Sequence, residues 1–369
     1  DYLKTLGIDA IWLTPFYISP QVDNGYDVAN YTAIDPAYGT LDDFDELVAE
    51  AHARGIRIVL DMVFNHTSTQ HAWFRESLNK ESPYREFYIW RDGTPEQLPN
   101  NWRSKFGGNA WRWHAESEQY YLHLFAPEQA DLNWENPQLR QEIYAMINWW
   151  LDKGIAGFRI DAITFIKKDQ DYASLPADGV DGLASIKTKS RNRPGIECFL
   201  NELKEHTFNR HRCVTVGEAP GVPLQEYDSY IGPDGYFNMI FDFHAADIDV
   251  ENGSEWFKQR NWRVSEFKEA LFASQRAFCQ AGWGTTFIEN HDQPRALSKL
   301  IRDADYQNDI GAKALAAMYF FMAGTPFIYQ GQELGMKNFC RQSIAEFDDI
   351  SSLDNYHRSL AEGFSEQQA

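Results

Sequence analysis

Residues 40–64, TLDDFDELVAEAHARGIRIVLDMVF, decide the fold class because they contain a helix followed directly by a strand. Thr40 is placed to cap the helix, acidic residues fill its first turn, and Gly55 ends it. Arg57–Phe64 then has the continuous apolar character of a buried strand. The earlier run Ile8–Pro15, IDAIWLTP, predicts another buried strand. Strand, helix and strand at this spacing predict a βαβ unit in a parallel sheet.

The same alternation continues along the chain. Asn136 and Pro137 begin a helix that stops before Gly154, and the strand Gly157–Ala162, GFRIDA, follows it. Counted together, seven strands with intervening helices predict an α/β fold, a (β/α)8 TIM barrel that lacks its first strand in this chain. The remaining predicted elements are strands at Cys213–Ala219, Tyr236–Phe243, Thr285–Asp292 and Pro326–Glu333 and helices at Ser265–Cys279 and Ile310–Met322.

An interruption of this rhythm separates two segments of the predicted barrel. From about Thr67 to Glu135 the chain has short segments rich in Trp, Tyr, Asn and Gly. Such a long aromatic segment is expected to pack as a small inserted domain over a binding face, after the third barrel strand. The predicted organisation is a first barrel segment at residues 1–66, the inserted domain at 67–135 and a second barrel segment at 136–369.

The composition is that of an acidic globular protein. Hydrophobic residues make up 43% of the 369 residues and charged residues 24%, which indicates a soluble protein. The formal charge of −20 opposes binding to nucleic acid or to an anionic membrane, and no apolar run is long enough to cross a bilayer. The four cysteines are widely spaced without a CxxC pair, which favours reduced thiols in the cytoplasm and no metal cluster.

Polar residues end several of the predicted strands. Asp161, Glu218 and Asp292 lie at three such ends, and His66 and His291 lie beside two of them. In a parallel barrel these ends open onto one mouth, where active sites are built. A single carboxylate can be a helix cap and a single histidine a hydrogen-bonded core residue. The whole set at one end is better explained by a functional pocket.

Arg159 and Asp161 project from the same face of their strand because they are two residues apart. An arginine beside an aspartate lowers the pKa of the carboxyl and keeps it ionised, as a nucleophile requires. The other interpretation is a buried structural ion pair. A metal site is disfavoured because no HExxH or DxDxDG motif occurs and the arginine would compete with a cation. One ionised and one protonated carboxyl about 5 Å apart would suit retaining glycoside hydrolysis.

Six blocks of the sequence resemble the α-amylase family of retaining glycoside hydrolases (glycoside hydrolase family 13), in its oligo-1,6-glucosidase and α-glucosidase branch. Their occurrence in family order across nearly the whole chain is far more specific than any one block. The resemblance implies that the first strand and a calcium-binding loop precede Asp1, that a β-sandwich follows Ala369, and that the chemistry needs no cofactor. The blocks are Asp61–His66, Gln129–Trp134, Gly157–Asp161, Val216–Glu218, Ile288–Arg295 and Gly324–Met336.

The resemblance also implies a role for each candidate residue. Asp161 would be the nucleophile, Glu218 the general acid and then base, and Asp292 the carboxylate that grips the sugar hydroxyls in the transition state. Asp23 and Arg295 would close the pocket behind the terminal glucose, which implies attack from the non-reducing end. The other expected pocket residues are Tyr26 beneath the sugar ring, His66, Arg159 and His291 around it, Phe106, Phe125 and Gln129 at the entrance, and Ala162 after the nucleophile.

Ala162 bears on linkage preference. In this branch, valine at that position is associated with α-1,6 linkages and threonine or a smaller residue with α-1,4 linkages, whereas the surrounding blocks resemble α-1,6 enzymes. The linkage therefore stays open.

The expected function is that of a monomeric, exo-acting, retaining α-glucosidase that hydrolyses terminal α-1,4 or α-1,6 bonds of small α-glucosides. A sucrose isomerase or transglucosylase with the same carboxylates is the alternative. A hydrolase of phosphorylated disaccharides needs a basic pocket, which the acidic composition disfavours. A non-catalytic relative would typically have lost a catalytic carboxylate, and this sequence has all three.

Overall fold

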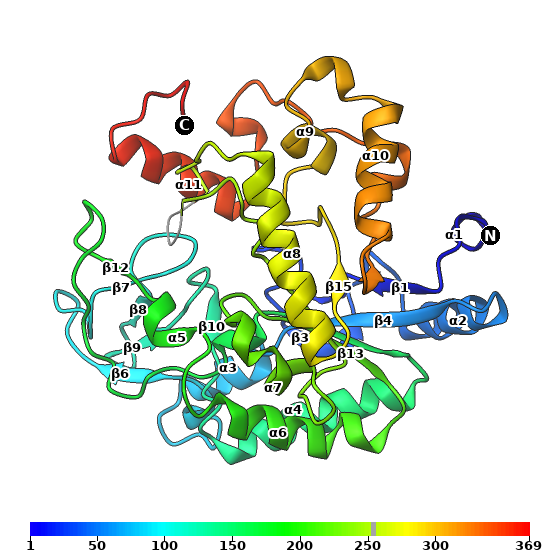
Figure 1. The fold of residues 1–369 in the computed structure, drawn as a ribbon. Coiled ribbons are helices and arrows are strands. Elements are labelled where there is room, and N and C mark those ends of the chain that lie inside the picture. Colours follow the sequence, from blue (N-terminus) through cyan, green and yellow to red (C-terminus); the bar gives the residue numbers. More distant parts are fainter. Residues whose placement is uncertain (252–255) are drawn as a thin grey trace. The chain divides into compact units, whose positions relative to one another are not determined.

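The structure is a computed structural model that describes residues 1–251 and 256–369 of the chain. These residues divide into two compact units, shown in Figure 1 with colours that follow the sequence. The first unit comprises residues 1–221 and 348–369, and the second comprises residues 222–347. None of the helices in the described residues has both the length and the apolar character needed to cross a membrane.

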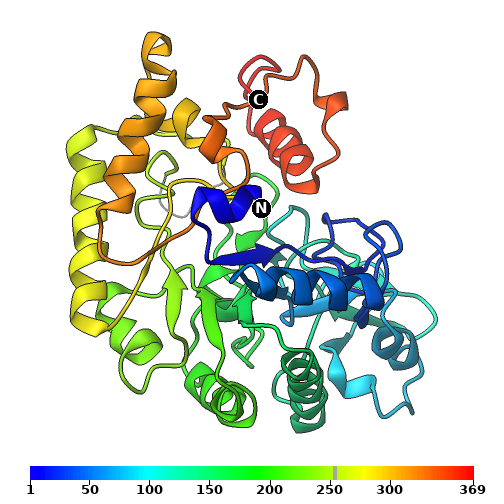
Figure 2. The same ribbon diagram turned by 90° about the vertical axis from the view of Figure 1, so that its right-hand side faces the viewer.

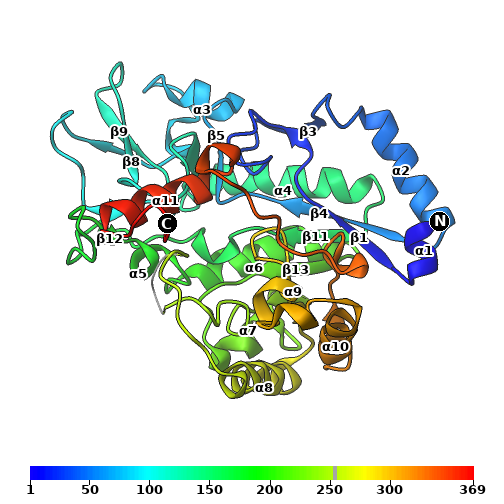
Figure 3. The same ribbon diagram turned by 90° about the horizontal axis from the view of Figure 1, so that it is seen from above.

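Parallel strands form the centre of the first unit (Figure 2). Each strand is hydrogen-bonded in parallel to the next, and helices lie in the connections, so the predicted βαβ rhythm is confirmed. Figure 3 shows two of these helices, α4 and α6, running beside the sheet. In order across the sheet, the strands are β1 (Ala10–Leu13), β4 (Arg57–Met62), β11 (Gly157–Ile160) and β13 (Val214–Glu218). The helices in their connections are α2 (Leu41–Ala53), α4 (Pro137–Asp152) and α6 (Ile196–His206).

Gly157 allows β11 and β13 to approach closely. Its φ is 148°, and a Cβ built there would lie 1.8 Å from the carbonyl oxygen of Val214, its partner across the ladder. A side chain at this position would therefore force the two strands apart. The parallel register ends with Ile160 opposite Gly217, and Asp161 and Glu218 are the next residues along the two chains.

The helix boundaries follow the capping residues that the sequence displays. Thr40 and Asp43 form a capping box at the start of α2, in which each side chain accepts a hydrogen bond from the backbone N–H of the other. Asn136 caps α4 and Pro137 takes its first position. Trp150 lies on the apolar stripe of α4 and is fully buried. Both predicted helices are thus confirmed, and α4 is anchored through its apolar face.

Most strands of the segment between β4 and α4 pair antiparallel, although β7 pairs in parallel with β12 (Ala184–Ser185). Its strands β6, β9 and β8 form one small sheet, and β5 pairs with β10 where the segment begins and ends. Aromatic residues fill its core, as the composition of the segment suggests, and the domain bounds 67–135 stay a prediction. The elements are β5 (His66–Ser68), α3 (Ala72–Ser77), β6 (Trp90–Asp92), β7 (Trp102–Arg103), β8 (Trp111–His114), β9 (Gln119–Leu122) and β10 (Gln129–Asp131).

The first unit has further short elements, and its last helix comes from the end of the chain. These elements are α1 (Tyr2–Leu6), β2 (Tyr17–Ile18), β3 (Asn30–Ile34), β12 (Ala184–Ser185), α5 (Lys187–Ser190) and α11 (Ile350–Ala361).

The second unit combines helices with short strands. Its strands β15 and β16 pair in parallel over two residues each, so the predicted strands at 285–292 and 326–333 are too long. The chain turns away from the first of these ladders before Asp292, whose backbone N–H donates to the Asn290 side chain at 2.9 Å. Closure of a barrel and the missing strand stay predictions. The elements are α7 (Tyr227–Ile231), β14 (Met239–Phe241), α8 (Val264–Ala281), β15 (Thr285–Thr286), α9 (Ala296–Leu300), α10 (Asp309–Phe320) and β16 (Thr325–Pro326).

Candidate active site

Arg159 is a buried cation that contacts three carboxylates from neighbouring strands. Its Nη1 donates to Asp61 Oδ1 at 3.0 Å and to Asp161 Oδ1 at 2.6 Å, and its Nη2 lies 3.3 Å from Glu218 Oε2. Asp61 is the cross-strand partner of Arg159 on β4, Asp161 follows β11, and Glu218 ends β13. Adjacent parallel strands therefore deliver the predicted nucleophile and the predicted acid to one guanidinium.

The charge state of Asp161 differs from the expectation based on Arg159 alone. Burial raises the pKa of Asp161 well above its usual range and the charge of Glu218 raises it further, while Arg159 opposes both. The expected lowering of this pKa is thus wrong, because burial and the charge of Glu218 together outweigh the effect of Arg159. For Arg159, burial lowers the pKa, but the charges of Asp61 and Glu218 outweigh it and keep the side chain cationic.

Asp61 is a site residue that sequence reasoning did not single out. Its side chain is 0% exposed and accepts hydrogen bonds from Tyr26 Oη at 2.8 Å and from Trp12 Nε1 at 3.1 Å, in addition to Arg159. The available signal was a carboxylate within an apolar strand, since a buried charge requires partners. Tyr26 thus lies at the site as expected, and its place beneath a sugar ring stays a prediction.

Ala162 connects the predicted nucleophile to the predicted acid through its backbone. It has left-handed angles of φ 45° and ψ 32°, and its N–H donates to Glu218 Oε2 at 2.7 Å. Its side chain is buried in a cluster that includes Phe125 and Phe165. The residue after Asp161 therefore orients Glu218 as well as packing beside the site.

His66 is buried on β5 and is neutral. Burial lowers its pKa to about 4. Its Nδ1 lies 3.2 Å from the Asn65 side-chain nitrogen, and its Nε2 lies 3.1 Å from the backbone oxygen of Tyr26. The Gln129 side-chain nitrogen lies 3.1 Å from the same Nε2, so this ring atom faces both a donor and an acceptor.

Gln129 and Phe125 contact His66, and Phe106 packs against Phe125. Gln129 donates to Asp23 Oδ2 at 2.8 Å and is fully buried on β10. The ring centres of Phe125 and His66 are 4.9 Å apart, and those of Phe106 and Phe125 are 5.6 Å apart. Their role at a substrate entrance stays a prediction.

A second buried ion pair supports this region and was not predicted. Lys168 Nζ lies 2.8 Å from Asp131 Oδ1, and both side chains are almost fully buried. Lys168 also donates to Asn65 Oδ1 at 3.0 Å, and Asn65 donates to Asp131 at 2.9 Å. Because Asn65 also contacts His66, this network helps to hold the histidine in place.

The other predicted site residues belong to the second unit. His291 Nε2 lies 3.4 Å from Asp292 Oδ2. Arg295 donates to Glu289 Oε1 at 2.9 Å and its guanidinium lies 4.4 Å from the centre of the Tyr329 ring. The approach of these residues to Asp161, and the pairing of Asp23 with Arg295, stay predictions.

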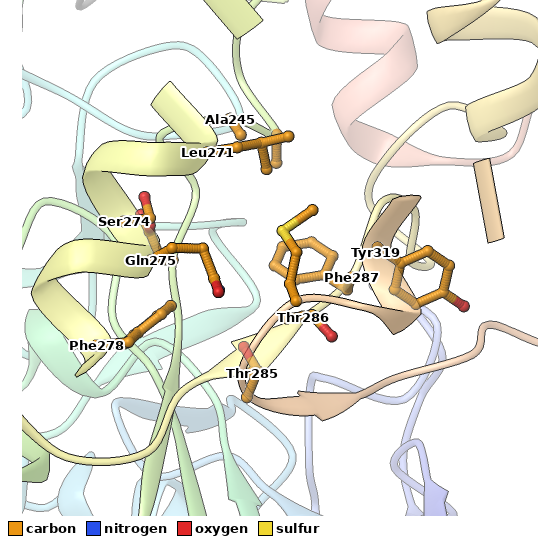
Figure 4. Close-up of a pocket in the computed structure, with 12 residues that line it drawn as sticks. Ala245, Leu271, Ser274, Gln275, Phe278, Thr285, Thr286, Phe287 and Tyr319 are labelled. Atoms are coloured by element: carbon orange, nitrogen blue, oxygen red, sulfur yellow. The ribbon is translucent and has the colours of Figure 1, made fainter. Parts of the chain in front are cut away.

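The second unit also encloses a cavity of about 40 Å³. Figure 4 shows Gln275 and Phe278 of α8 on one side of it and Thr286, Phe287 and Tyr319 on the other. The hydroxyl of Thr286 is buried without a hydrogen-bond partner among the described residues. Such a volume admits water but not a sugar ring, and none of the predicted site residues lines it.

Residues 1–363 match the family model described as the alpha amylase catalytic domain. This chain belongs to that family, whose catalytic domain is a TIM barrel with a parallel central sheet. The resemblance seen in the six sequence blocks is confirmed.

Individual relatives differ in their substrates. Trehalose-6-phosphate hydrolase of Escherichia coli (strain K12) is 52% identical over 358 residues, which are 96% of this chain and 63% of that protein. Probable oligo-1,6-glucosidase 3 of Bacillus subtilis (strain 168) is 46% identical over 371 residues, covering 100% of this chain and 66% of that protein. An isomaltulose synthase variant from Erwinia rhapontici NX5, in complex with D-glucose, superposes with a TM-score of 0.93 at 39% identity and covers 100% of this chain and 66% of its own. This chain thus spans about two thirds of the length of its relatives.

Proposed function

We propose that this chain is the catalytic portion of an exo-acting, retaining α-glucoside hydrolase. One observation carries the proposal: Arg159 contacts both Asp161 and Glu218, which end adjacent parallel strands. Two carboxyls that share a buried cation and raise each other's cost of ionisation are suited to hold one proton between them. Retaining glycoside hydrolysis needs one ionised and one protonated carboxyl, and in the proposed reaction the ionised one must be Asp161.

In the proposed reaction Asp161 attacks the anomeric carbon and forms a covalent glucosyl-enzyme. Glu218 first donates a proton to the departing oxygen and then takes one from the water that releases glucose. Arg159 orients both carboxyls, and the N–H of Ala162 holds Glu218 through Oε2. Asp292 would add charge stabilisation around the oxocarbenium-like transition state.

Attack at the non-reducing end of the oligosaccharide is supported by contacts on one side of the site. Asp23, Gln129 and His66 are joined there by hydrogen bonds and close contacts, and Gln129 is fully buried. A sugar whose far side meets such a wall has no room for a further residue. We therefore assign terminal, non-reducing glucose units of small α-glucosides as the substrate.

Two substrate classes have specific support. The oligo-1,6-glucosidase relative favours short α-1,6 oligosaccharides, one of the two linkages expected from the sequence. The higher identity to a trehalose-6-phosphate hydrolase, 52% against 46%, favours a phosphorylated disaccharide. Sucrose isomerisation, the activity class of the solved isomaltulose synthase, has weaker support at 39% identity.

The test of this proposal compares the wild-type protein with Asp161→Asn and Glu218→Gln on maltose, isomaltose, sucrose and trehalose 6-phosphate. Each variant should lose activity on the order of 10⁴-fold or more on every substrate that the wild type cleaves. The glucose first released should be the α-anomer, since two displacements retain configuration. Hydrolysis at the wild-type rate by either variant contradicts the proposal, and a dominant disaccharide product from sucrose favours isomerisation.

A further inference from the structure

Lys105 lies against the aromatic side chains at the entrance of the candidate site. Its Nζ is 5.1 Å from the centre of the Phe125 ring and 4.6 Å from that of Phe165. Phe125 packs against His66, and both phenylalanine rings belong to the buried cluster that contains Ala162. The ammonium is therefore one aromatic ring away from residues assigned to the substrate pocket.

No carboxylate neutralises this ammonium within the first unit, all of whose residues the structure describes. The lysines that follow the nucleophile differ in this respect, because Lys167 pairs with Glu135 and Lys168 with Asp131. Acidic residues outnumber Lys and Arg by 54 to 34, so composition alone would lead one to expect a carboxylate beside each lysine, which Lys105 lacks within the first unit. The ammonium of Lys105 can therefore pair with an anionic group of a ligand.

The backbone around Lys105 is fixed while its ammonium keeps its donors. Its N–H donates to Leu124 O at 2.7 Å, and the Ser104 hydroxyl donates to Phe125 O at 2.6 Å. Contact with ring faces is electrostatic and leaves the three N–H groups of an ammonium able to reach an anion. A lysine held in this way is a point-charge ligand suited to phosphate oxygens.

We propose that Lys105 determines substrate specificity by binding the phosphate of an α-glucoside whose second sugar is phosphorylated. The inference rests on the proposed function, since Asp161 and Glu218 must cleave the bond. Lys105 lies against the cluster that contains Ala162, whose N–H holds the proposed acid Glu218, so its ammonium is near the acid that would protonate the leaving sugar. The net charge of −20 does not oppose this, because solvent ions screen distant charges beyond about 8 Å.

The test compares trehalose 6-phosphate with trehalose, which differ only in the phosphate. For wild type, Lys105→Met, Lys105→Glu and Lys105→Arg, the measured quantity is the ratio of kcat/KM for the two sugars. Lys105→Met should lower this ratio about 10- to 100-fold, mainly through KM, because a hydrogen bond to a charged group is lost. Lys105→Glu should lower it further, and Lys105→Arg should restore most of it. A merely structural lysine would change both substrates equally.

Lys268→Met is the matched control. Lys268 is exposed on α8 with its Nζ 5.3 Å from the centre of the Phe272 ring, so its replacement removes the same charge and the same kind of ring contact. It should leave the ratio at the wild-type value. An unchanged ratio in both Lys105→Met and Lys105→Glu, or a wild type without preference for the phosphorylated sugar, overturns the inference while the proposed hydrolase stands. A wild type that cleaves no α-glucoside overturns both.

Discussion

At the scale of single residues, the three carboxylates around Arg159 show that an arrangement suited to catalysis can lower the stability of the fold. The guanidinium holds Asp161 and Glu218 in place but is also shared with Asp61, so Asp161 is costly to ionise within the fold. A nucleophile must be ionised to attack, so the proposed reaction needs the charge state of Asp161 that the fold favours least. The cost of holding several acids together is thus concentrated where the proposed chemistry occurs.

Asp161→Asn should therefore stabilise the protein, and the gain should depend on pH. The folded-state pKa of Asp161 is raised above the unfolded value of about 3.9, so ionisation destabilises the fold increasingly as pH rises through that value. The free energy of unfolding in urea should be higher for the variant at pH 7, and the difference should vanish near pH 3. The exposed control Glu116→Gln should show no such trend. A variant that is less stable than wild type at every pH contradicts this interpretation.

At the scale of elements, the parallel strands and the capped helices were predictable, whereas several contacts between side chains were not. Thr40, Asn136 and Pro137 are local signals, because a cap acts within one turn. The roles of Asp61 and Lys168 depend on which strands become neighbours, which no local pattern shows. The ladders of β15 and β16 are shorter than their apolar runs suggest, because the chain leaves the ladder directly after Thr286.

Lys168 joins three elements, and its loss should be costly. Lys168 lies in the segment after β11 and contacts Asp131 on β10 and Asn65 after the end of β4. Lys168→Met would leave Asp131 as an unpaired buried charge, which should lower the free energy of unfolding by about 3–5 kcal/mol. The neighbouring control, Lys167→Met, loses a partner that is 38% exposed and should cost at most about 1 kcal/mol. Urea denaturation measures both. Equal losses would show that the buried pair has no special role.

At the scale of the whole molecule, charge and local structure carry different information. The acidic composition argues against a phosphorylated substrate when the chain is treated as a uniform charge. Lys105, which has no carboxylate partner among the residues of the first unit, is the local exception on which the proposed phosphate contact rests. Family and reaction class were predictable from ordered sequence blocks, and the match over residues 1–363 confirms the family. Substrate preference depends on side chains brought together from distant segments, so the sequence left it open.

The identity of the nucleophile is the central claim, and covalent trapping tests it directly. A fluorinated α-glucosyl fluoride forms the glucosyl-enzyme but slows its hydrolysis, so the intermediate accumulates and can be digested and sequenced by mass spectrometry. The label should be found on the carboxylate of Asp161, and the Asp161→Asn variant should remain unlabelled. A label on Glu218, on Asp61 or on no residue while the sugar fluoride is still hydrolysed would contradict the account.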